Sequence, residues 1–264
     1  MGYFDNKKSM EVRALLHTED MKNRYEKETV LSASLSTIYY EAFNPALVEG
    51  TPKRIEVIDA GSVEAAFNEY NCGMQNGKNV KPCILNFASY KNPGGMFLAG
   101  SSAQEECLCH ASNLYNILEK FNKDYYIPHR QKGATNRALY SNQAIYSPDV
   151  VFEYEKNTFK CDVLTCAAPN FSAAHRYYGV TSKKNAEVLF DRITFLRKIL
   201  ENNHVDTVIL GAYGCGVFGQ DPNLVASYMN QIFKDSNIDT IVYAIPRGLN
   251  EKNYLAFERR IEQV

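Results

Sequence analysis

The sequence has no tryptophan, no long apolar run and almost no net charge, and these absences exclude several classes of protein. None of its uninterrupted apolar stretches approaches the roughly 18 residues that a membrane-spanning helix needs. The formal net charge is -1, so no overall positive field attracts nucleic acid or an anionic membrane surface. An anionic ligand must therefore be bound by local groups, such as backbone amides, rather than by the charge of the whole protein.

Several chemical motifs are missing as well. No G-x-x-x-x-G-K-S/T segment is present, which excludes a P-loop, and no early strand is followed by G-x-G-x-x-G, which argues against a dinucleotide dehydrogenase. Cys107, Cys109 and His110 form a C-x-C-H cluster, but no second ligand pair stands at zinc spacing, so packing is the favoured interpretation. A Cys–His nucleophile on Cys109 or Cys215 is an alternative that no spacing supports. We expect no metal and no cofactor.

The cysteines and the first residues of the chain favour an intracellular location. The seven cysteines are an odd number, and Cys161 and Cys166 lie in an apolar, strand-like run, which is typical of reduced and buried thiols. The segment MGYFDNKKSMEVR has neither the apolar core nor the cleavage site of a secretory signal. We therefore expect a cytoplasmic protein that acts as a monomer.

Apolar, strand-like segments alternate with amphipathic helical segments along most of the chain. The predicted strands are 54–60, 81–89, 161–169, 206–212 and 239–246, and the aromatic stretch 125–160 is predicted to form short strands and loops. The predicted helices are 7–42, 62–70 with Ser62 as N-cap, 104–121, 182–202, 222–233 and 250–263. This alternation is typical of one α/β domain with a sheet covered on both faces, here 51–264, preceded by a helical arm, 1–50, packed on it.

Two glycine-rich loops each join the end of a predicted strand to the start of a predicted helix. The first is NPGGMFLAGSS, and the second is GAYGCGVFGQDP. Ligands of α/β proteins bind beyond the carboxyl ends of the strands, where glycines let backbone amides approach a phosphate. A tight turn explains either loop alone, but two such loops in one chain favour an anion site.

Two adjacent carboxylates, Glu105 and Glu106, begin the helix after the first loop. Neighbouring helical residues diverge by about 100°. We therefore expect one carboxylate to face the ligand while the other binds a hydroxyl or caps the helix. Simple stabilisation of the helix dipole by acidic residues in the first turn is the alternative.

The combination of a Gly-Gly turn, a short loop and Gln-Glu-Glu resembles the catalytic signature of microbial poly(ADP-ribose) glycohydrolases, a branch of the macrodomain fold. GAYGCGVFGQDP resembles the second phosphate loop of that family, and the similarity runs from about Ile55 to Pro246. The resemblance implies a three-layer α/β/α mixed sheet with an N-terminal helical extension. It also implies ADP-ribose, poly(ADP-ribose) or ADP-ribosylated proteins as partners, and neither DNA nor a membrane.

The resemblance assigns roles residue by residue. Glu106 matches the catalytic general acid/base, and Glu105 matches the second glutamate of the catalytic motif, which binds ribose hydroxyls. The positions that match substrate-binding residues are Ser89, Gly94, Gly95, Met96, Gln104, Gly214, Cys215, Gly216, Val217 and Phe218. The Phe218 ring is expected to pack on the distal ribose, and the implied reaction is cleavage of the ribose–ribose O-glycosidic bond to release ADP-ribose.

The chain departs from the family pattern at two positions. Met96 replaces a third glycine, which is expected to restrict the loop's φ angle, and Ser89 replaces an asparagine, which is expected to hold the ribose less firmly. These departures keep open a module that binds ADP-ribose without cleaving it, or one that removes only single ADP-ribose units from proteins. Retention of both glutamates favours the hydrolase.

Aromatic and basic side chains form a further group, whose default interpretation is core or surface. Its members are Tyr125, Tyr126, Tyr140, Tyr146, Arg130 and Arg137, and stacking on bases is the alternative. Residues 175–178, His-Arg-Tyr-Tyr, are expected to lie on a loop.

Overall fold

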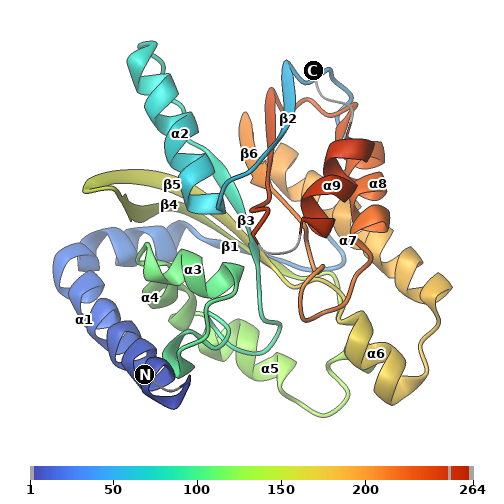
Figure 1. The fold of residues 1–264 in the computed structure, drawn as a ribbon, viewed down its shortest axis with the longest axis horizontal. Helices are drawn as coiled ribbons and strands as arrows, with labels where there is room; N and C mark the ends of the chain where they lie inside the picture. The colour runs from blue at the N-terminus through green and yellow to red at the C-terminus, as the bar shows by residue number, and fades with distance from the viewer. Residues whose placement is uncertain (1–2, 249–250, 262–264) are drawn as a thin grey trace.

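A computed structural model of the chain describes residues 3–248 and 251–261. Its centre is a mixed seven-stranded sheet of order β1-β4-β5-β3-β6-β7-β2 (Figure 1). The strands are β1 Thr37–Tyr39, β2 Arg54–Ile58, β3 Cys83–Phe87, β4 Ala144–Tyr154, β5 Asn157–Cys166, β6 Thr207–Leu210 and β7 Thr240–Ala244. The pairs β1–β4 and β4–β5 are antiparallel, and the five strands from β5 to β2 run parallel.

Helices cover both faces of this sheet. They are α1 Tyr3–Leu35, α2 Ser62–Gln75, α3 Gln104–His110, α4 Leu114–Glu119, α5 Ile127–His129, α6 Phe171–Tyr178, α7 Ser182–Asn202, α8 Pro222–Phe233 and α9 Lys252–Arg260. Three shorter helical turns are η1 Phe97–Ala99, η2 Asn122–Tyr126 and η3 Asn136–Ala138. In the described part of the chain, none of these helices combines the length and apolarity that crossing a membrane demands.

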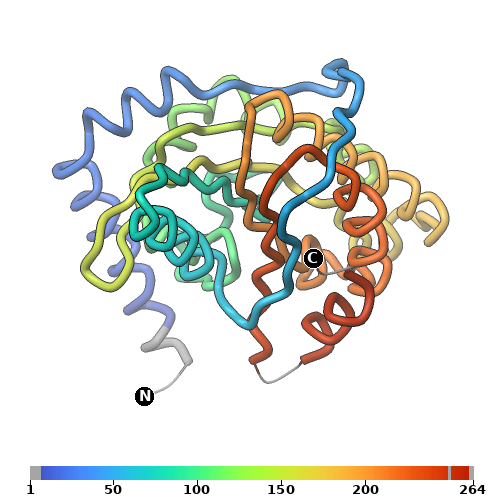
Figure 2. Tube along the Cα trace, turned by 90° about the horizontal axis from the view of Figure 1, so that it is seen from above, coloured from blue at the N-terminus to red at the C-terminus, as the bar shows by residue number. Residues whose placement is uncertain are grey.

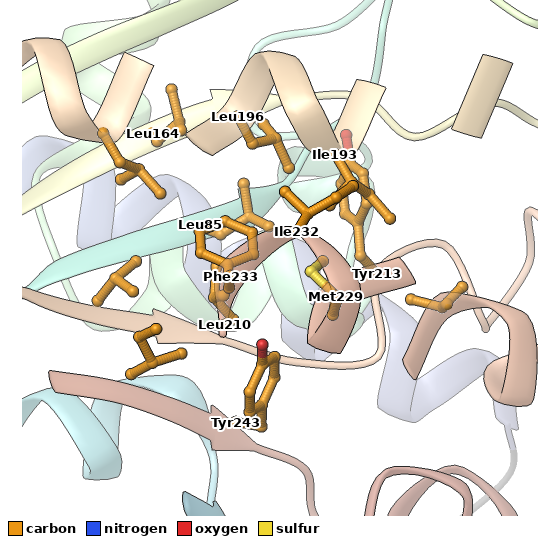
Figure 3. Packing of buried hydrophobic residues seen from close by; sticks show 14 of the residues in the cluster. Leu85, Leu164, Ile193, Leu196, Leu210, Tyr213, Met229, Ile232, Phe233 and Tyr243 are labelled. Atoms are coloured by element: carbon orange, nitrogen blue, oxygen red, sulfur yellow. The ribbon is translucent and has the colours of Figure 1, made fainter. Parts of the chain in front are cut away.

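Two hydrophobic cores form because side chains of a strand alternate between the faces of the sheet. In β3, Leu85 belongs to the core under α7, α8 and α9, whereas Ile84 belongs to the core under α2, α3 and α4. Figure 3 shows the first core, where strand residues such as Leu164 and Leu210 pack against helix residues such as Leu196. The predicted three-layer α/β/α architecture is confirmed.

The N-terminal arm contributes to the sheet. Helix α1 ends at Leu35, and β1 follows and pairs with β4, so the predicted helix over 7–42 is wrong at its end. Pairing with β4 favours an extended chain for the Thr-Ile-Tyr run. β1 and β2 lie at opposite edges of the sheet, and Figure 2 shows the connecting segment crossing the molecule between them. The division at residue 50 stays a prediction.

Three other predicted elements differ in the structure. The predicted helix 104–121 is broken between α3 and α4, because the Asn113 amide donates to the Val151 carbonyl of β4 instead of continuing a helix. The stretch 125–160 contains one long strand, β4, which pairs with β5 in a hairpin, and residues 175–178 belong to α6. Ser62 is the first residue of α2, and Gly61 is its N-cap.

The remaining predictions agree more closely with the structure. The predicted helices 182–202 and 222–233 match α7 and α8 residue for residue. The predicted helix 250–263 corresponds to α9, and its predicted ends lie outside the described residues. Strands β3 and β6 are neighbours and parallel, so the two glycine-rich loops that follow them lie at the same edge of the sheet.

Candidate active site

A cavity of about 420 Å³ lies between the two glycine-rich loops, beyond the carboxyl ends of β3 and β6. The predicted residues that line it are Ser89, Gly95, Met96, Gln104, Glu105, Glu106, Gly214, Gly216, Val217 and Phe218. Gly94 and Cys215 are the predicted site residues that do not line it. The fold therefore brings together segments that are far apart in the sequence.

Glu105 is buried and held by backbone and amide donors. One carboxylate oxygen accepts a hydrogen bond from the Ser89 amide at 2.6 Å, and the other accepts one from Asn86 Nδ2 at 3.3 Å. Burial raises the pKa of Glu105 to about 8; the negative charge of Glu106 adds to the rise, and the hydrogen bonds oppose it. Glu105 is therefore protonated at neutral pH and can donate a hydrogen bond to a ligand hydroxyl.

Glu106 has one fixed oxygen and one unpaired oxygen. Its Oε1 accepts a hydrogen bond from the Met96 amide at 2.8 Å, and the side chain is 5% exposed. Its Oε2 is buried and has no hydrogen-bond partner among the described residues. A buried oxygen without a partner is unfavourable, and Glu106 is one of the residues that line the cavity. Glu106 therefore combines a position in the cavity wall with a carboxylate oxygen that no described protein group occupies.

The two carboxyl groups converge, contrary to the prediction that they diverge. A Cβ built on Gly95 would lie 2.6 Å from Glu106 Oε1 and 2.8 Å from Glu105 Oε2. The long side chains bend toward the same loop even though their Cα–Cβ bonds point apart. Neither carboxylate caps α3, whose N-cap is Ala103 without a side-chain bond.

Gln104 fastens the start of α3 to the sheet. Its Oε1 accepts a hydrogen bond from the Phe87 amide at 2.9 Å, and its Nε2 donates to the Leu85 carbonyl at 2.9 Å. The side chain thus extends the hydrogen bonding of β3. Because Glu105 and Glu106 are the next two residues of α3, this contact fixes their position relative to the end of β3. The predicted contact of Gln104 with substrate stays a prediction.

The first glycine-rich loop holds the glutamates. Gly94 and Gly95 have φ of +64° and +62°, a region that residues with a Cβ avoid. A Cβ on Gly94 would meet the Tyr115 ring at 2.8 Å, so this residue faces the packed side of the loop rather than the cavity. Met96 has φ of -109° and a side chain that is 54% exposed, so the expected restriction of φ does not arise.

The residue that replaces asparagine in the family pattern, Ser89, has a local role. Its hydroxyl oxygen accepts hydrogen bonds from the amides of Lys91 at 3.3 Å and Asn92 at 3.2 Å. These bonds fix the turn that starts the first loop. The expected weaker hold on a ribose stays a prediction.

The second glycine-rich loop presents unpaired amides. The N–H groups of Gly216, Val217 and Phe218 donate to no other described residue. Successive free amides in a loop form a concave anion-binding surface. The loop is closed at its base, where the Gln220 amide donates to the Gly214 carbonyl at 3.0 Å. These amides fit a pyrophosphate better than the amides of Met96 in the first loop and of Ser89 just before it, which already donate to the glutamates.

The side chains around the second loop point in different directions. Val217 is 86% exposed, whereas Cys215 packs partly against the core under α8 and lines a separate hollow with Gln220 and Lys252. The Phe218 ring lines the cavity, and its centroid lies 6.1 Å from that of Tyr140.

A stack of aromatic rings forms one wall of the cavity. The sequence did not predict that these rings stack on one another. The Tyr90 ring stacks on His129 at 3.9 Å and on Tyr140 at 4.2 Å, and Tyr140 faces Phe218. Burial lowers the pKa of His129, and hydrogen bonds hold its ring, with Nδ1 3.0 Å from the Tyr90 carbonyl oxygen and Nε2 2.7 Å from Gln143 Oε1. No local pattern signals this wall, because its members come from three distant segments.

An unusual backbone turn places Tyr140 in this wall. Asn136, Arg137, Ala138 and Tyr140 have φ of +44°, +52°, +66° and +62°. Left-handed conformations are unfavourable for residues with a Cβ, and such strain concentrates at functional sites. Hydrogen bonds hold the turn: the Tyr140 amide donates to Thr135 and the Asn170 amide to Ala138.

A second hollow of about 470 Å³ continues the cavity along the sheet edge. It shares Phe87, Gln104 and Ala212 with the first cavity and extends between the start of α2 and the end of β7. Together the two spaces form an elongated cleft across the ends of β3, β6, β7 and β2. Such a shape suits a ligand with two bulky ends joined by an anionic centre.

The C-x-C-H cluster does not converge on a common point for a metal. Cys107 is exposed, and Cys109 is buried against α4 and the first loop. Within residues 3–248 and 251–261, no group of three or more His, Cys, Asp or Glu side chains is arranged to hold a metal ion.

The mixed seven-stranded sheet with helices on both faces, and a cleft between two glycine-rich loops, define a macrodomain-like α/β protein. A family model described as the microbial-type PARG catalytic domain matches residues 7–153. The chain therefore belongs to the family of microbial-type poly(ADP-ribose) glycohydrolase catalytic domains. No match was found among curated proteins.

Solved structures of two bacterial proteins are similar over almost the whole chain. The poly(ADP-ribose) glycohydrolase of Thermomonospora curvata bound to the inhibitor ADP-HPD is 28% identical with a TM-score of 0.83, covering 96% of this chain and 99% of that chain. The poly(ADP-ribose) glycohydrolase of Deinococcus radiodurans in complex with ADP-ribose is 25% identical with a TM-score of 0.73, covering 89% of this chain and 97% of that chain.

Proposed function

We propose that this protein hydrolyses the ribose–ribose O-glycosidic bonds of poly(ADP-ribose) and releases ADP-ribose, with Glu106 as the general acid and base. The observation that carries the proposal is Glu106, which lines a cavity flanked by a loop with three free amides and which has one carboxylate oxygen without a described partner. Family membership and the similarity to bacterial poly(ADP-ribose) glycohydrolases support the same reaction.

The features of the cleft favour one orientation of ADP-ribose along it. ADP-ribose has an adenosine and a distal ribose joined by a pyrophosphate. The free amides of Gly216, Val217 and Phe218 are suited to the pyrophosphate, which leaves the distal ribose beside the glutamates. The adenosine then lies in the second hollow, near Val63 and Ile245. This orientation places the scissile bond at Glu106.

The chemistry follows from the two glutamates. As general acid, Glu106 gives a proton to the leaving ribose oxygen as the bond to the anomeric carbon breaks, which leaves an oxocarbenium-like sugar. The resulting carboxylate accepts a proton from the attacking water, and the hydroxide of that water bonds to the anomeric carbon. Glu105, protonated at neutral pH, donates a hydrogen bond to a ribose hydroxyl and fixes the sugar. The nearby pyrophosphate stabilises the developing positive charge.

Glu106→Gln tests the proposal. Purified wild type is expected to release free ADP-ribose from labelled poly(ADP-ribose), and Glu106→Gln to release none while still binding ADP-ribose in calorimetry. Glu119→Gln, an exposed carboxylate on α4, is the matched control and should keep full activity. Equal turnover by Glu106→Gln would remove Glu106 from the mechanism, and binding without release by wild type would favour a non-catalytic reader.

Removal of single ADP-ribose units from proteins is the second candidate, because that reaction would also need an acid in this cavity, which Glu106 lines. A mono-ADP-ribosylated protein, tested in the same assay as poly(ADP-ribose), shows which of the two substrates the protein prefers.

We also propose a cytoplasmic location, supported by seven cysteines that are all unpaired in the structure. Location of the tagged protein by fractionation tests this.

A further inference from the structure

Three segments without carboxylates contribute residues to or near the cavity wall. Segments 86–104, 125–148 and 163–186 contain no Asp or Glu, although the chain has 30 acidic residues. These segments carry seven Lys and Arg residues, and we call five of them the basic rim: Lys91, Arg130, Lys132, Arg137 and Arg176. All five are exposed, and none forms an ion pair with another described residue. A cluster of unpaired cations on a protein with net charge -1 is a local departure from its overall charge.

The structure brings the basic rim together from three segments. Lys91 lines the catalytic cavity, and Arg130 Nε donates to the Lys91 carbonyl at 2.8 Å. Arg137 lies in η3, which packs on α6, and the Asn170 amide before α6 donates to the carbonyl of the next residue, Ala138. Figure 1 shows α5 and α6 along the same edge of the molecule. Arg176 on α6 thus extends the surface that begins at the cavity.

Exposed aromatic rings accompany these cations. Tyr177 and Tyr178 at the end of α6 are 68% and 51% exposed, and the Arg176 guanidinium lies 5.3 Å from the centre of the Tyr177 ring. Large exposed aromatics beside cations are the combination that binds flexible nucleotide chains, through stacking on bases and attraction of phosphates.

We propose that the basic rim, together with Tyr177 and Tyr178, binds the part of the poly(ADP-ribose) chain that extends beyond the unit in the cavity. This inference rests on the proposed function. Lys91 lines the catalytic cavity and not the second hollow, so the rim lies at the end away from the proposed adenosine position. Each further unit of the polymer carries two phosphates and an adenine, which match cations and exposed rings. The rim therefore selects long chains over free ADP-ribose.

The test compares two triple variants that remove the same charge from different faces. The rim variant is Lys132→Gln, Arg137→Gln and Arg176→Gln, and the control variant is Lys22→Gln, Lys27→Gln and Lys156→Gln. All six residues are exposed and form no ion pair with another described residue, so both variants should fold, which thermal melting checks. Binding to chains longer than 20 units and to ADP-ribose is measured across a range of salt concentrations.

The rim variant is expected to bind long chains roughly ten- to hundredfold more weakly at physiological salt, with a salt slope smaller by about 2, since single strands lose about 0.7 per contact. Its affinity for ADP-ribose should change less than twofold, and the control should match wild type in both assays. Equal losses for chain and ADP-ribose, or an unchanged salt slope, would overturn the proposal. If single-stranded RNA of the same charge binds equally well, the basic rim is a general polyanion site and the proposal that it recognises poly(ADP-ribose) fails.

The result is separable from that of the proposed function. If wild type releases no ADP-ribose, the hydrolase proposal fails, while the binding comparison still decides the role of the rim. If wild type is active and the rim variant keeps its KM for long chains, only the rim proposal fails. An active rim variant is expected to keep kcat and to raise KM for long chains alone.

Discussion

Gly95→Ala is expected to disable the site while leaving the fold intact. The new Cβ would lie 2.6 Å from Glu106 Oε1 and 2.8 Å from Glu105 Oε2. The shorter contact must lengthen by about 0.8 Å to reach ordinary van der Waals distance, so the carboxyl groups or the loop have to move by most of an ångström. A misplacement of about 1 Å at a catalytic centre lowers the rate roughly 100-fold. We expect kcat to fall by that factor.

A second glycine separates this contact from backbone strain. Gly95 has φ of +62°, and Gly77 at the end of α2 has φ of +66° with nothing within 4 Å of the added Cβ. Gly77→Ala therefore costs about 1–2 kcal/mol of stability through its left-handed conformation alone. Gly95→Ala should lose the same amount plus the contact term, measured by urea unfolding.

The assay is the release of ADP-ribose from poly(ADP-ribose) by the two variants and wild type at a temperature where all three are folded. Gly77→Ala should keep wild-type kcat, which shows that strain far from the site is harmless. If Gly95→Ala keeps wild-type kcat as well, the two carboxyl groups do not need their observed positions, and the reasoning about the site is refuted.

Three further predictions concern the residues around the glutamates. The pKa of Glu105 is about 8 in the folded protein, whereas its ordinary value is 4.5, so between these pH values the unfolded chain loses a proton that the folded protein retains. The free energy of unfolding should therefore fall as pH rises from about 4.5 to about 8, by at most about 1.4 kcal/mol per pH unit. Urea titrations of Glu105→Gln should lack this slope. Gln104→Ala leaves the Phe87 amide unpaired and should reduce the free energy of unfolding by about 2–3 kcal/mol, while an unchanged urea midpoint would contradict its role in fastening α3. Tyr140→Leu should lower kcat about tenfold by releasing Phe218, Tyr140→Phe should restore it, and equal losses in both variants would point to the hydroxyl instead of the ring.

The local pattern of the sequence determined the elements whose signal is local. The periodicity of 182–202 and 222–233 predicted α7 and α8 to the residue, because long amphipathic helices carry their own signal. The glycine-rich loops and Gln-Glu-Glu were recognisable for the same reason, since left-handed turns and adjacent carboxylates leave a local trace. Ten of the 20 residues that line the cavity could therefore be named from the sequence.

The tertiary structure decided what depends on partners distant in sequence. β1 is a strand because β4 pairs with it, and α3 ends early because Asn113 bonds to β4; neither partner can be seen from the local sequence. The local sequence also could not predict that the carboxyl groups of Glu105 and Glu106 converge, because this depends on how Gln104 and the first loop position the two glutamate side chains.

The wall of the cavity and the basic rim have the same origin. Tyr90, His129 and Tyr140 stack only because the segment after β3, α5 and the turn after η3 meet in space. The sequence by itself therefore determined the chemical groups of this protein, because residue type and spacing are local properties. Only the tertiary structure decided their mutual distances, their burial and the raised pKa of Glu105, because each of these depends on contacts between segments that the chain keeps far apart.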